Sequence, residues 1–510
     1  MRALRWCSTS ISIAIAALTL SACEEHVPPA SFPAPPAPDA DPIASSKPEL
    51  PPPAPFEPPA PVVYEAANGL TVWLLERHSV PMVSVTLALP YGSAADPAGK
   101  EGLAHITADM LDEGAGSRDA LQLSTAINDL GASLATGASV DGSSVSLVVL
   151  KKNLRPAFEL WSDVVARPRF DAKEWKRVSS LWKNDLQKRA QDPGAVSRAV
   201  IAAVLYGRES PYGHPSNGLL STAASIDLPA AKGFYASHYR PDKATLVVAG
   251  DVTRAELDAL LASTLGGWKA PAKAAPASPV GTPRANTPRV VLVDRPDAPQ
   301  SVLAVVRAGV SAADPRAPLL DLVNTALGGS FTSRLNQDLR EEHGWSYGAG
   351  SRFAETRGTG TFLASASVIT EATAPALKAM IADLDRMAKE GLTPDELDKV
   401  RAQDRADLVQ TYETVGGVGR RLGALATLGL PPGFDAAASR ARQKAGKPEL
   451  DRLASAVSPN GATILVVGPA AAVAPQIEAA GLGKPEMFDT EGSPKKDGPA
   501  KPAPAKKKKK

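Results

Sequence analysis

Cysteine is almost absent from this sequence, and its two residues, Cys7 and Cys23, both lie close to the start of the chain. The rest of the chain can therefore contain neither a disulfide bond nor a thiolate metal site. Histidine is also scarce, with 6 residues in a chain of 510. Any metal site would have to be built from a few histidines and from carboxylates.

The sequence also lacks an excess of charge of one sign. Its 56 Lys and Arg residues nearly balance 54 Asp and Glu residues, which leaves a formal net charge of +2. Such a balance creates no general field that attracts nucleic acid, so we expect no nucleic-acid partner. Apolar residues are plentiful at 44%, enough for more than one hydrophobic core.

The first 22 residues are predicted to be a lipoprotein signal peptide. An apolar run at 11–20 follows two arginines, and Leu20-Ser21-Ala22-Cys23 resembles the bacterial lipobox. This resemblance implies that cleavage leaves Cys23 as a lipidated N-terminus that holds the chain on a membrane. We expect a lipid-anchored protein of the cell envelope, at the outer membrane and facing the periplasm. An ordinary secretory signal is the alternative.

Two short sequences recur at one unchanged offset of 218 positions. Ser-Ala-Ala-Asp-Pro at 93–97 returns at 311–315, and the strand-like segment at 244–250 returns at 462–468. Two matches at one offset indicate an internal duplication. Because strand and helix patterns alternate irregularly, the predicted fold class is α+β, with two duplicated domains that each pack helices on a mostly antiparallel sheet.

Composition sets the predicted boundaries of these domains. Proline-rich segments that cannot form a core separate the folded parts, and a run of lysines ends the chain. The predicted order is a signal peptide at 1–22, a Pro-rich tether at 23–61, a first domain at 62–268, a linker at 269–288, a second domain at 289–482 and a disordered Lys-rich tail at 483–510.

Several stretches, taken in order, resemble the pitrilysin or insulinase-type metallopeptidases. They are residues 91–93 with 102–105, 191–193, 211–213, 234–241, 247–251 and 339–347. The resemblance covers residues 62–482, and it implies the metallohydrolase-like fold of that family and peptide substrates. The glycine-bearing loop at 327–331 also looks like one in the family that admits backbone close to a substrate.

The family's zinc motif is altered in this chain. In H-x-x-E-H, two His one helical turn apart bind zinc, the Glu takes a proton from the metal-bound water, and a carboxylate about seventy to eighty residues later is the third ligand. The resemblance places these roles at His105, Ala108, Asp109 and Asp185, so only His105 is retained. Loss of a general base alone costs about two to four orders of magnitude in rate. We therefore predict no independent peptidase activity and no cofactor.

A carboxylate-rich metal site is the alternative for this segment. Glu101, His105 and Asp109 are spaced i, i+4, i+8 on one predicted helix face, and Asp185 would join them around zinc or another divalent cation. The protein would then be an active metallopeptidase with an atypical His/Asp/Asp site. The plainer interpretation is that His105 packs or forms a hydrogen bond on its own helix.

The second copy keeps a different part of the family's machinery. The resemblance implies that an Arg and a Tyr seven residues apart bind substrate backbone, and Arg340 and Tyr347 match this spacing. A broken zinc half beside an intact Arg/Tyr half resembles the non-catalytic subunit of heterodimeric processing-peptidase-like members. The expected partner is a zinc-bearing homologous subunit, or a second copy, in peptide degradation or processing. A non-enzymatic peptide-binding scaffold lipoprotein is the alternative.

Overall fold

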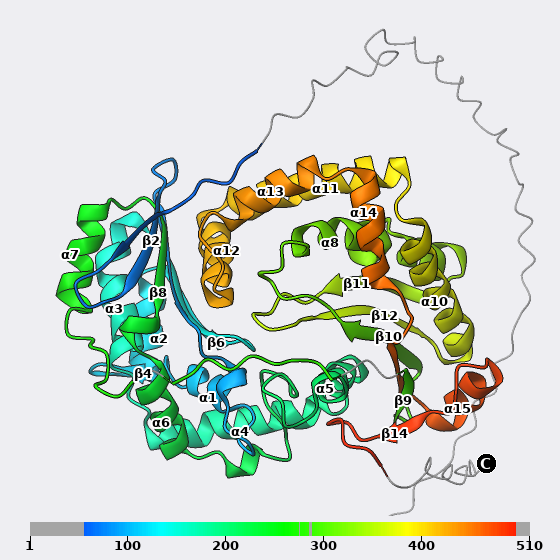
Figure 1. The fold of residues 1–510 in the computed structure, drawn as a ribbon. Helices are drawn as coiled ribbons and strands as arrows, with labels where there is room; N and C mark the ends of the chain where they lie inside the picture. The colour runs from blue at the N-terminus through cyan, green and yellow to red at the C-terminus, as the bar shows by residue number, and fades with distance from the viewer. Residues whose placement is uncertain (1–55, 275, 285–287, 496–510) are drawn as a thin grey trace, which may run out of the picture. The chain divides into compact units, whose positions relative to one another are not determined.

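The computed structural model describes residues 56–274, 276–284 and 288–495 of the chain (Figure 1). The predicted signal peptide, the predicted lipidation site Cys23 and most of the predicted tether lie outside the described residues, as does the predicted tail from residue 496. Across the described ranges, no helix combines the length and the apolar character needed to cross a membrane.

The first half of the chain is a six-stranded sheet with helices packed against it (Figure 1). The strand order is β1-β2-β8-β3-β7-β6, in which β2 and β8 are parallel and the other neighbours are antiparallel. The strands are β1 (Val62–Glu65), β2 (Thr71–Glu76), β3 (Met82–Leu89), β6 (Ser133–Ala138), β7 (Ser143–Leu150) and β8 (Thr245–Gly250), with a separate pair β4 (Gly114–Ala115) and β5 (Arg118–Asp119). The helices are α1 (Leu103–Asp109), α2 (Ala120–Asp129), α3 (Leu154–Ala166), α4 (Ala172–Arg189), α5 (Pro193–Tyr206), α6 (Leu228–His238) and α7 (Arg254–Thr264).

The second half has a sheet of the same size, in the order β11-β12-β10-β13-β9-β14. The strands are β9 (Arg289–Asp294), β10 (Gln300–Ala308), β11 (Ser346–Phe353), β12 (Thr361–Ile369), β13 (Thr463–Gly468) and β14 (Glu486–Phe488). The helices are α8 (Ala317–Asn324), α9 (Arg334–Asn336), α10 (Thr373–Glu390), α11 (Pro394–Glu413), α12 (Val415–Leu428), α13 (Phe434–Lys444), α14 (Lys447–Leu453) and α15 (Ala470–Ala479), with two π-helical segments, η5 (Thr325–Gly329) and η6 (Gln337–Glu342).

Strand pairing confirms the predicted duplication. Across the first sheet, β2, β8, β3, β7 and β6 follow one another, and across the second sheet β9, β13, β10, β12 and β11 do the same. In both series the first pair is parallel and the next three pairs are antiparallel. The repeated segments at 244–250 and 462–468 become the equivalent strands β8 and β13. The fold is therefore the predicted α+β arrangement of two like domains.

Hydrophobic periodicity accounts for the elements that surround the candidate site. Side chains of β7 alternate between buried and partly exposed, which is the period of a strand with one face against a core. In α4 the buried residues are Val178, Trp182 and Leu186, spaced i, i+4, i+8 along one helix face. Both elements pack into the core of the first half, which also contains Leu103, Ala104 and Ile106 of α1.

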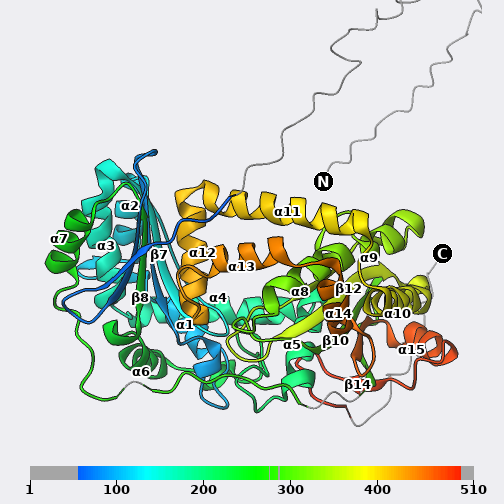
Figure 2. The same ribbon diagram turned by 45° about the horizontal axis from the view of Figure 1, so that its top comes forward.

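Each half contributes a helix to the other half's sheet, and Figure 2 shows α12 beside the first sheet and α5 near β10. Val418 and Leu422 of α12 share an apolar cluster with Trp73 and Val247 of the first sheet. In the opposite direction, Val200 of α5 belongs to a cluster with side chains of β9, β10 and β13. This reciprocal packing joins the halves in one compact unit.

A buried polar contact also joins the halves. Asp141, 3% exposed, accepts a hydrogen bond from the Tyr212 hydroxyl. Its other carboxylate oxygen accepts from the Arg357 backbone N–H at 2.9 Å, and its carbonyl accepts from the Arg357 guanidinium at 3.0 Å. These partners compensate the cost of burying a carboxylate between the two halves.

One predicted domain boundary was wrong. The second domain does not end at residue 482, because β14 pairs with β9 in parallel and Phe488 is buried. Residues 483–495 are therefore not part of a disordered tail. No structure was predicted for the segment that forms the strand β6, Ser133–Ala138. This segment contains one large apolar residue and is ordered by pairing with β7.

Candidate functional site

The helix that carries the altered zinc motif begins abruptly at Leu103. Gly102 precedes it with φ 105°, a left-handed conformation that favours glycine, and a Cβ at this position would lie 2.7 Å from the Trp182 ring. The carboxylate of Asp96 accepts hydrogen bonds from the backbone N–H groups of Gly102 and Ala104, both at 2.7 Å. Asp96 therefore satisfies donors at the start of α1 that have no partner within the helix.

The motif residues divide between two faces of α1. Ala104, Ile106 and Ala108 are fully buried and belong to the interior. His105 and Asp109 are partly exposed on the other face, with Nε2 of His105 3.3 Å from Oδ2 of Asp109. The structure therefore brings the retained histidine and the altered second ligand position into contact.

Glu101 does not share this face, contrary to the i, i+4, i+8 interpretation. It precedes α1, and the positive φ of Gly102 turns the chain between Glu101 and the helix. Its Oε1 accepts a hydrogen bond from the Gly99 backbone N–H at 3.0 Å. The pKa of Glu101 is lowered by backbone hydrogen bonds, which outweigh the opposing effect of burial. Glu101 is thus a structural residue of the turn.

A cavity of about 470 Å³ lies beside the exposed face of α1. It joins the motif helix to α4 and to the edge strand β6. The lining contains all three candidate ligand positions, and its residues are His105, Asp109, Asp112, Glu113, Ala135, Thr136, Arg177, Val178, Leu181, Trp182, Asp185, Leu186 and Asn217. The spacing argument that selected Asp185 therefore identified a residue of the same cavity as His105 and Asp109.

The ionisable groups of this cavity are already engaged with one another. Burial raises the pKa of Asp109, an effect that the charge of His105 opposes. Burial, with the nearby charge of Glu113, raises the pKa of Asp112 to about 6. The guanidinium group of Arg177 forms an ion pair with Glu113 and another with Glu174 at 2.8 Å. The positively charged side chain of Arg177 thus lines the cavity. Sequence reasoning missed this residue because it belongs to no motif.

These residues do not fit the zinc site of the family. A catalytic zinc requires three protein ligands and an open fourth position. Asp185 is 71% exposed and its carboxylate lies 3.4 Å from Nζ of Lys188 on the same helix. Among the residues that the structure describes, no group of three or more His, Cys, Asp or Glu side chains could hold a metal ion. The base position offers only the buried methyl group of Ala108.

The candidate Arg/Tyr pair lies in the second half, away from this cavity. Arg340 is in η6 and its guanidinium carbon lies 4.5 Å from the centre of the Phe331 ring, in cation–π geometry. Tyr347 is in the edge strand β11 and is 90% exposed. Neither residue lines the cavity beside His105. The Tyr347 phenol is therefore open to an incoming chain, whereas the Arg340 side chain is 36% exposed and its Nε already lies 3.5 Å from Oε1 of Glu341.

The glycine-bearing loop before Arg340 has an internal role. A Cβ on Gly328 would lie 2.3 Å from the backbone nitrogen of Ser351 in β11. Gly328 therefore allows η5 to pack closely on the second sheet. This packing accounts for a glycine at position 328, and no contact with a substrate is needed to explain it.

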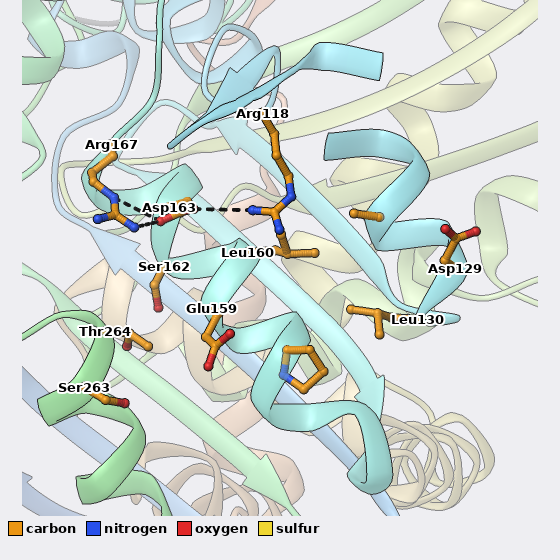
Figure 3. Close-up of a pocket in the computed structure, with 12 residues that line it drawn as sticks. Arg118, Asp129, Leu130, Glu159, Leu160, Ser162, Asp163, Arg167, Ser263 and Thr264 are labelled. Carbon is orange, nitrogen blue, oxygen red and sulfur yellow. Dashed lines mark hydrogen bonds and ion pairs between the residues drawn. The ribbon is translucent and has the colours of Figure 1, made fainter. Parts of the chain in front are cut away.

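A second polar cavity, of about 540 Å³, lies between α2, α3 and α7 (Figure 3). The guanidinium groups of Arg118 and Arg167 both point toward the carboxylate of Asp163 (Figure 3). Nε of Arg167 donates to Oδ1 of Asp163 at 3.0 Å, and Nη1 of Arg118 lies 4.0 Å from Oδ2. Both cations thus have an acidic partner within the protein.

Comparison with known proteins agrees with the duplicated fold. The model for the insulinase family of peptidases, M16, matches residues 71–209, and the model for the M16 inactive domain matches residues 225–403. An uncharacterized zinc protease of Mycobacterium tuberculosis is 26% identical over 357 residues, which cover 70% of this chain and 81% of that protein. The zinc protease YmxG of Bacillus subtilis is 21% identical over 351 residues, or 69% of this chain and 84% of YmxG.

Solved structures show the same architecture. The crystal structure of a peptidase M16 inactive domain from Pseudomonas fluorescens superimposes with a TM-score of 0.75 at 25% identity, covering 80% of this chain and 98% of that one. A protease from Helicobacter pylori gives a TM-score of 0.77 at 19% identity, covering 81% and 100%. From its sequence, its two matched domains and its fold, the chain belongs to the insulinase family of peptidases, M16.

Proposed function

We propose that this chain is a non-catalytic member of the family, which binds peptides and supplies Arg340 and Tyr347 to a zinc-bearing partner subunit in peptide degradation or processing. The observation that carries the proposal is the state of the motif helix. His105 is paired with Asp109 at 3.3 Å, and the general-base position is the buried Ala108. Without a base and without three metal ligands, this half cannot activate water by the family's mechanism.

An open strand edge supports peptide binding. The strand β6 is the last strand of the first sheet, and within the described residues its backbone groups form hydrogen bonds with no backbone except that of β7. Its small side chains leave the edge accessible to another extended chain, which could add to the sheet. Ala135 and Thr136 of this strand line the same cavity as His105. The peptide-binding part of the site can thus persist without the chemistry.

The partner and the location rest on separate arguments. The periplasmic protease PqqL of Escherichia coli has the same fold, with a TM-score of 0.66 at 17% identity, and this chain covers 85% of its own length but 51% of PqqL. In PqqL, therefore, a unit with this fold is joined to a second stretch of chain of similar length. We propose that a separate partner subunit takes the place of that second stretch in this protein. The lipobox at Cys23 supports an envelope location, with the lipidated end on the outer membrane and the body in the periplasm.

Reconstitution tests this function. The chain is mixed with a zinc-bearing family member from the same organism that has an intact H-x-x-E-H, and cleavage of unfolded peptides is followed. We expect activity on mixing that exceeds the sum of the separate proteins, and a loss of at least about tenfold for Arg340→Ala. The control is Arg452→Ala, an exposed arginine on α14. No gain on mixing, with peptide binding intact, would favour a scaffold lipoprotein without any role in turnover.

A further inference from the structure

A cavity of about 360 Å³ lies where the first turns of α5, from the first half, meet the face of the second sheet. It is distinct from the cavity beside His105, and no residue is shared between the two linings. Its lining is mostly small or serine side chains, with residues Gly194, Ser197, Arg198, Ile201, Val302, Gly348, Ala349, Gly350, Arg352, Leu363, Ser365, Ala366 and Ser367.

The charges of this cavity are unbalanced. Arg198 of α5 and Arg352 of β11 both line it, and the lining contains no Asp or Glu. Neither guanidinium group forms a hydrogen bond or an ion pair with any residue in the described part of the chain. The cavity of Figure 3 is the opposite case, since Arg118 and Arg167 there share the carboxylate of Asp163. Two arginines on one cavity without an acid leave a charge that an anion could neutralise.

Arg198 lies close enough to Arg352 to affect the pKa of Arg352. Burial lowers the pKa of Arg352, and the positive charge of Arg198 lowers it further. Both arginines are exposed at the mouth of the cavity, and a bound anion would offset the repulsion between their like charges. Guanidinium groups are also the side chains best shaped to bind a carboxylate through two parallel hydrogen bonds.

The surroundings favour an extended peptide as the source of that anion. Glycine and alanine at 348–350 leave room beside the arginines, and Tyr347, the exposed member of the Arg/Tyr pair, directly precedes them. Ser365 and Ser367 of β12 add hydroxyl groups that can donate to a carboxylate or a peptide carbonyl. The cavity therefore adjoins the segment proposed to contact substrate.

We propose that Arg198 and Arg352 together bind a carboxylate of the bound peptide, either an Asp or Glu side chain or the C-terminal carboxylate, and so give the chain a preference for acidic peptides. This inference rests on the proposed peptide-binding function and adds a substrate class to it. One arginine comes from each half of the chain, so the subsite exists only when the two halves are packed together.

Fluorescence anisotropy with the purified full chain tests the subsite. The probes are labelled unfolded peptides of one sequence that carry either Glu or Gln at central positions, each with a free or an amidated C-terminus. We expect wild-type protein to bind the Glu or the free-carboxylate form at least about tenfold more tightly than its neutral counterpart. The comparison between Glu and free C-terminus identifies which carboxylate is bound.

Variants connect the preference to the two arginines. Arg198→Ala and Arg352→Ala should each abolish the preference while binding of the neutral peptide persists, and Arg352→Lys should retain part of it. The matched control is Arg155→Ala, an arginine of α3 that is 61% exposed and remote from this cavity. Circular dichroism of each variant establishes that it is folded.

The possible failures are distinguishable. Equal binding of acidic and neutral peptides by the wild type overturns the subsite but leaves peptide binding intact. Absence of any peptide binding contradicts the proposed function itself. A preference that survives in both alanine variants, or inorganic phosphate that binds as tightly as the acidic peptide, also overturns the assignment of a peptide carboxylate.

Discussion

Nε2 of His105 lies 3.3 Å from Oδ2 of Asp109, one helical turn further along α1. In the family's motif these two positions hold histidines that bind one zinc ion side by side. Here the second position is a carboxylate, which attracts the imidazole directly and offers it a partner within the protein. In the proposed non-catalytic role, this intrahelical pair takes the place of a shared metal.

Restoring the ligands should restore metal binding. The double variant Asp109→His, Asp185→Glu returns both positions to the family's residue types within the cavity that they already line. We expect its zinc content to rise to about one ion per chain, since three ligands suffice to hold a catalytic zinc. Elemental analysis after dialysis against zinc measures this, and the same variant with His105→Ala serves as the control. Zinc content no higher than that of the wild type would mean that the cavity cannot bring the three side chains together.

Stability should depend on pH through Asp96. Burial raises the pKa of this carboxyl from its ordinary value of 3.8 to about 8, although three backbone N–H groups oppose the rise. The folded state binds the Asp96 proton more tightly than the unfolded state does. Protonation of Asp96 therefore adds to the free energy of unfolding in full below about pH 4, and this stabilisation is lost as the pH rises through about 8. Asp96→Asn cannot titrate at this position. We therefore expect the denaturation midpoint of this variant, minus that of the wild type, to increase as the pH is raised from about 4 to about 8. A constant difference between the two proteins across this range would contradict the shift.

The reciprocal helices should make the stability of the halves interdependent. Leu422 of α12 is fully buried in a cluster with Trp73, Leu75 and Val247 of the first sheet. Leu422→Ala should lower the free energy of unfolding by about 2–5 kcal/mol, because it creates a cavity at the contact between the halves. Urea denaturation measures the change, and Leu121→Ala, at a residue that is 77% exposed, should change it by less than about 0.5 kcal/mol. A loss as small as that of the control would show that α12 contributes little to the contact.

Much of the framework could be predicted from the sequence. The offset of 218 positions identified the two copies, because equivalent strands such as β8 and β13 need the same apolar run in the same place. A helix within residues 99–114 was expected from the resemblance to a zinc-protease helix, and the observed helix covers only Leu103–Asp109 of that segment. Asp185 falls in the same cavity as His105.

The features that sequence reasoning missed depend on tertiary contacts. Spacing alone placed Glu101 on the face of His105, but the left-handed conformation of Gly102 separates them, and this conformation is set by the close approach of Trp182 and Gly218. The strand β6 has little hydrophobic pattern of its own and is specified by β7. Arg198 and Arg352 are 154 positions apart in the chain, and only the packing of α5 on the other half's sheet brings them to one cavity.

Under the proposed function, this chain binds peptides but does not cleave them. The most direct measurement is mass spectrometry of an unfolded peptide that has been incubated with the purified chain in saturating zinc, under conditions in which anisotropy shows that the peptide is bound. We expect the peptide to remain intact, because Ala108 can accept no proton and the ligand set is incomplete among the described residues. Cleavage products that disappear with a chelator and in His105→Ala would contradict it and would establish an active metallopeptidase with an atypical site.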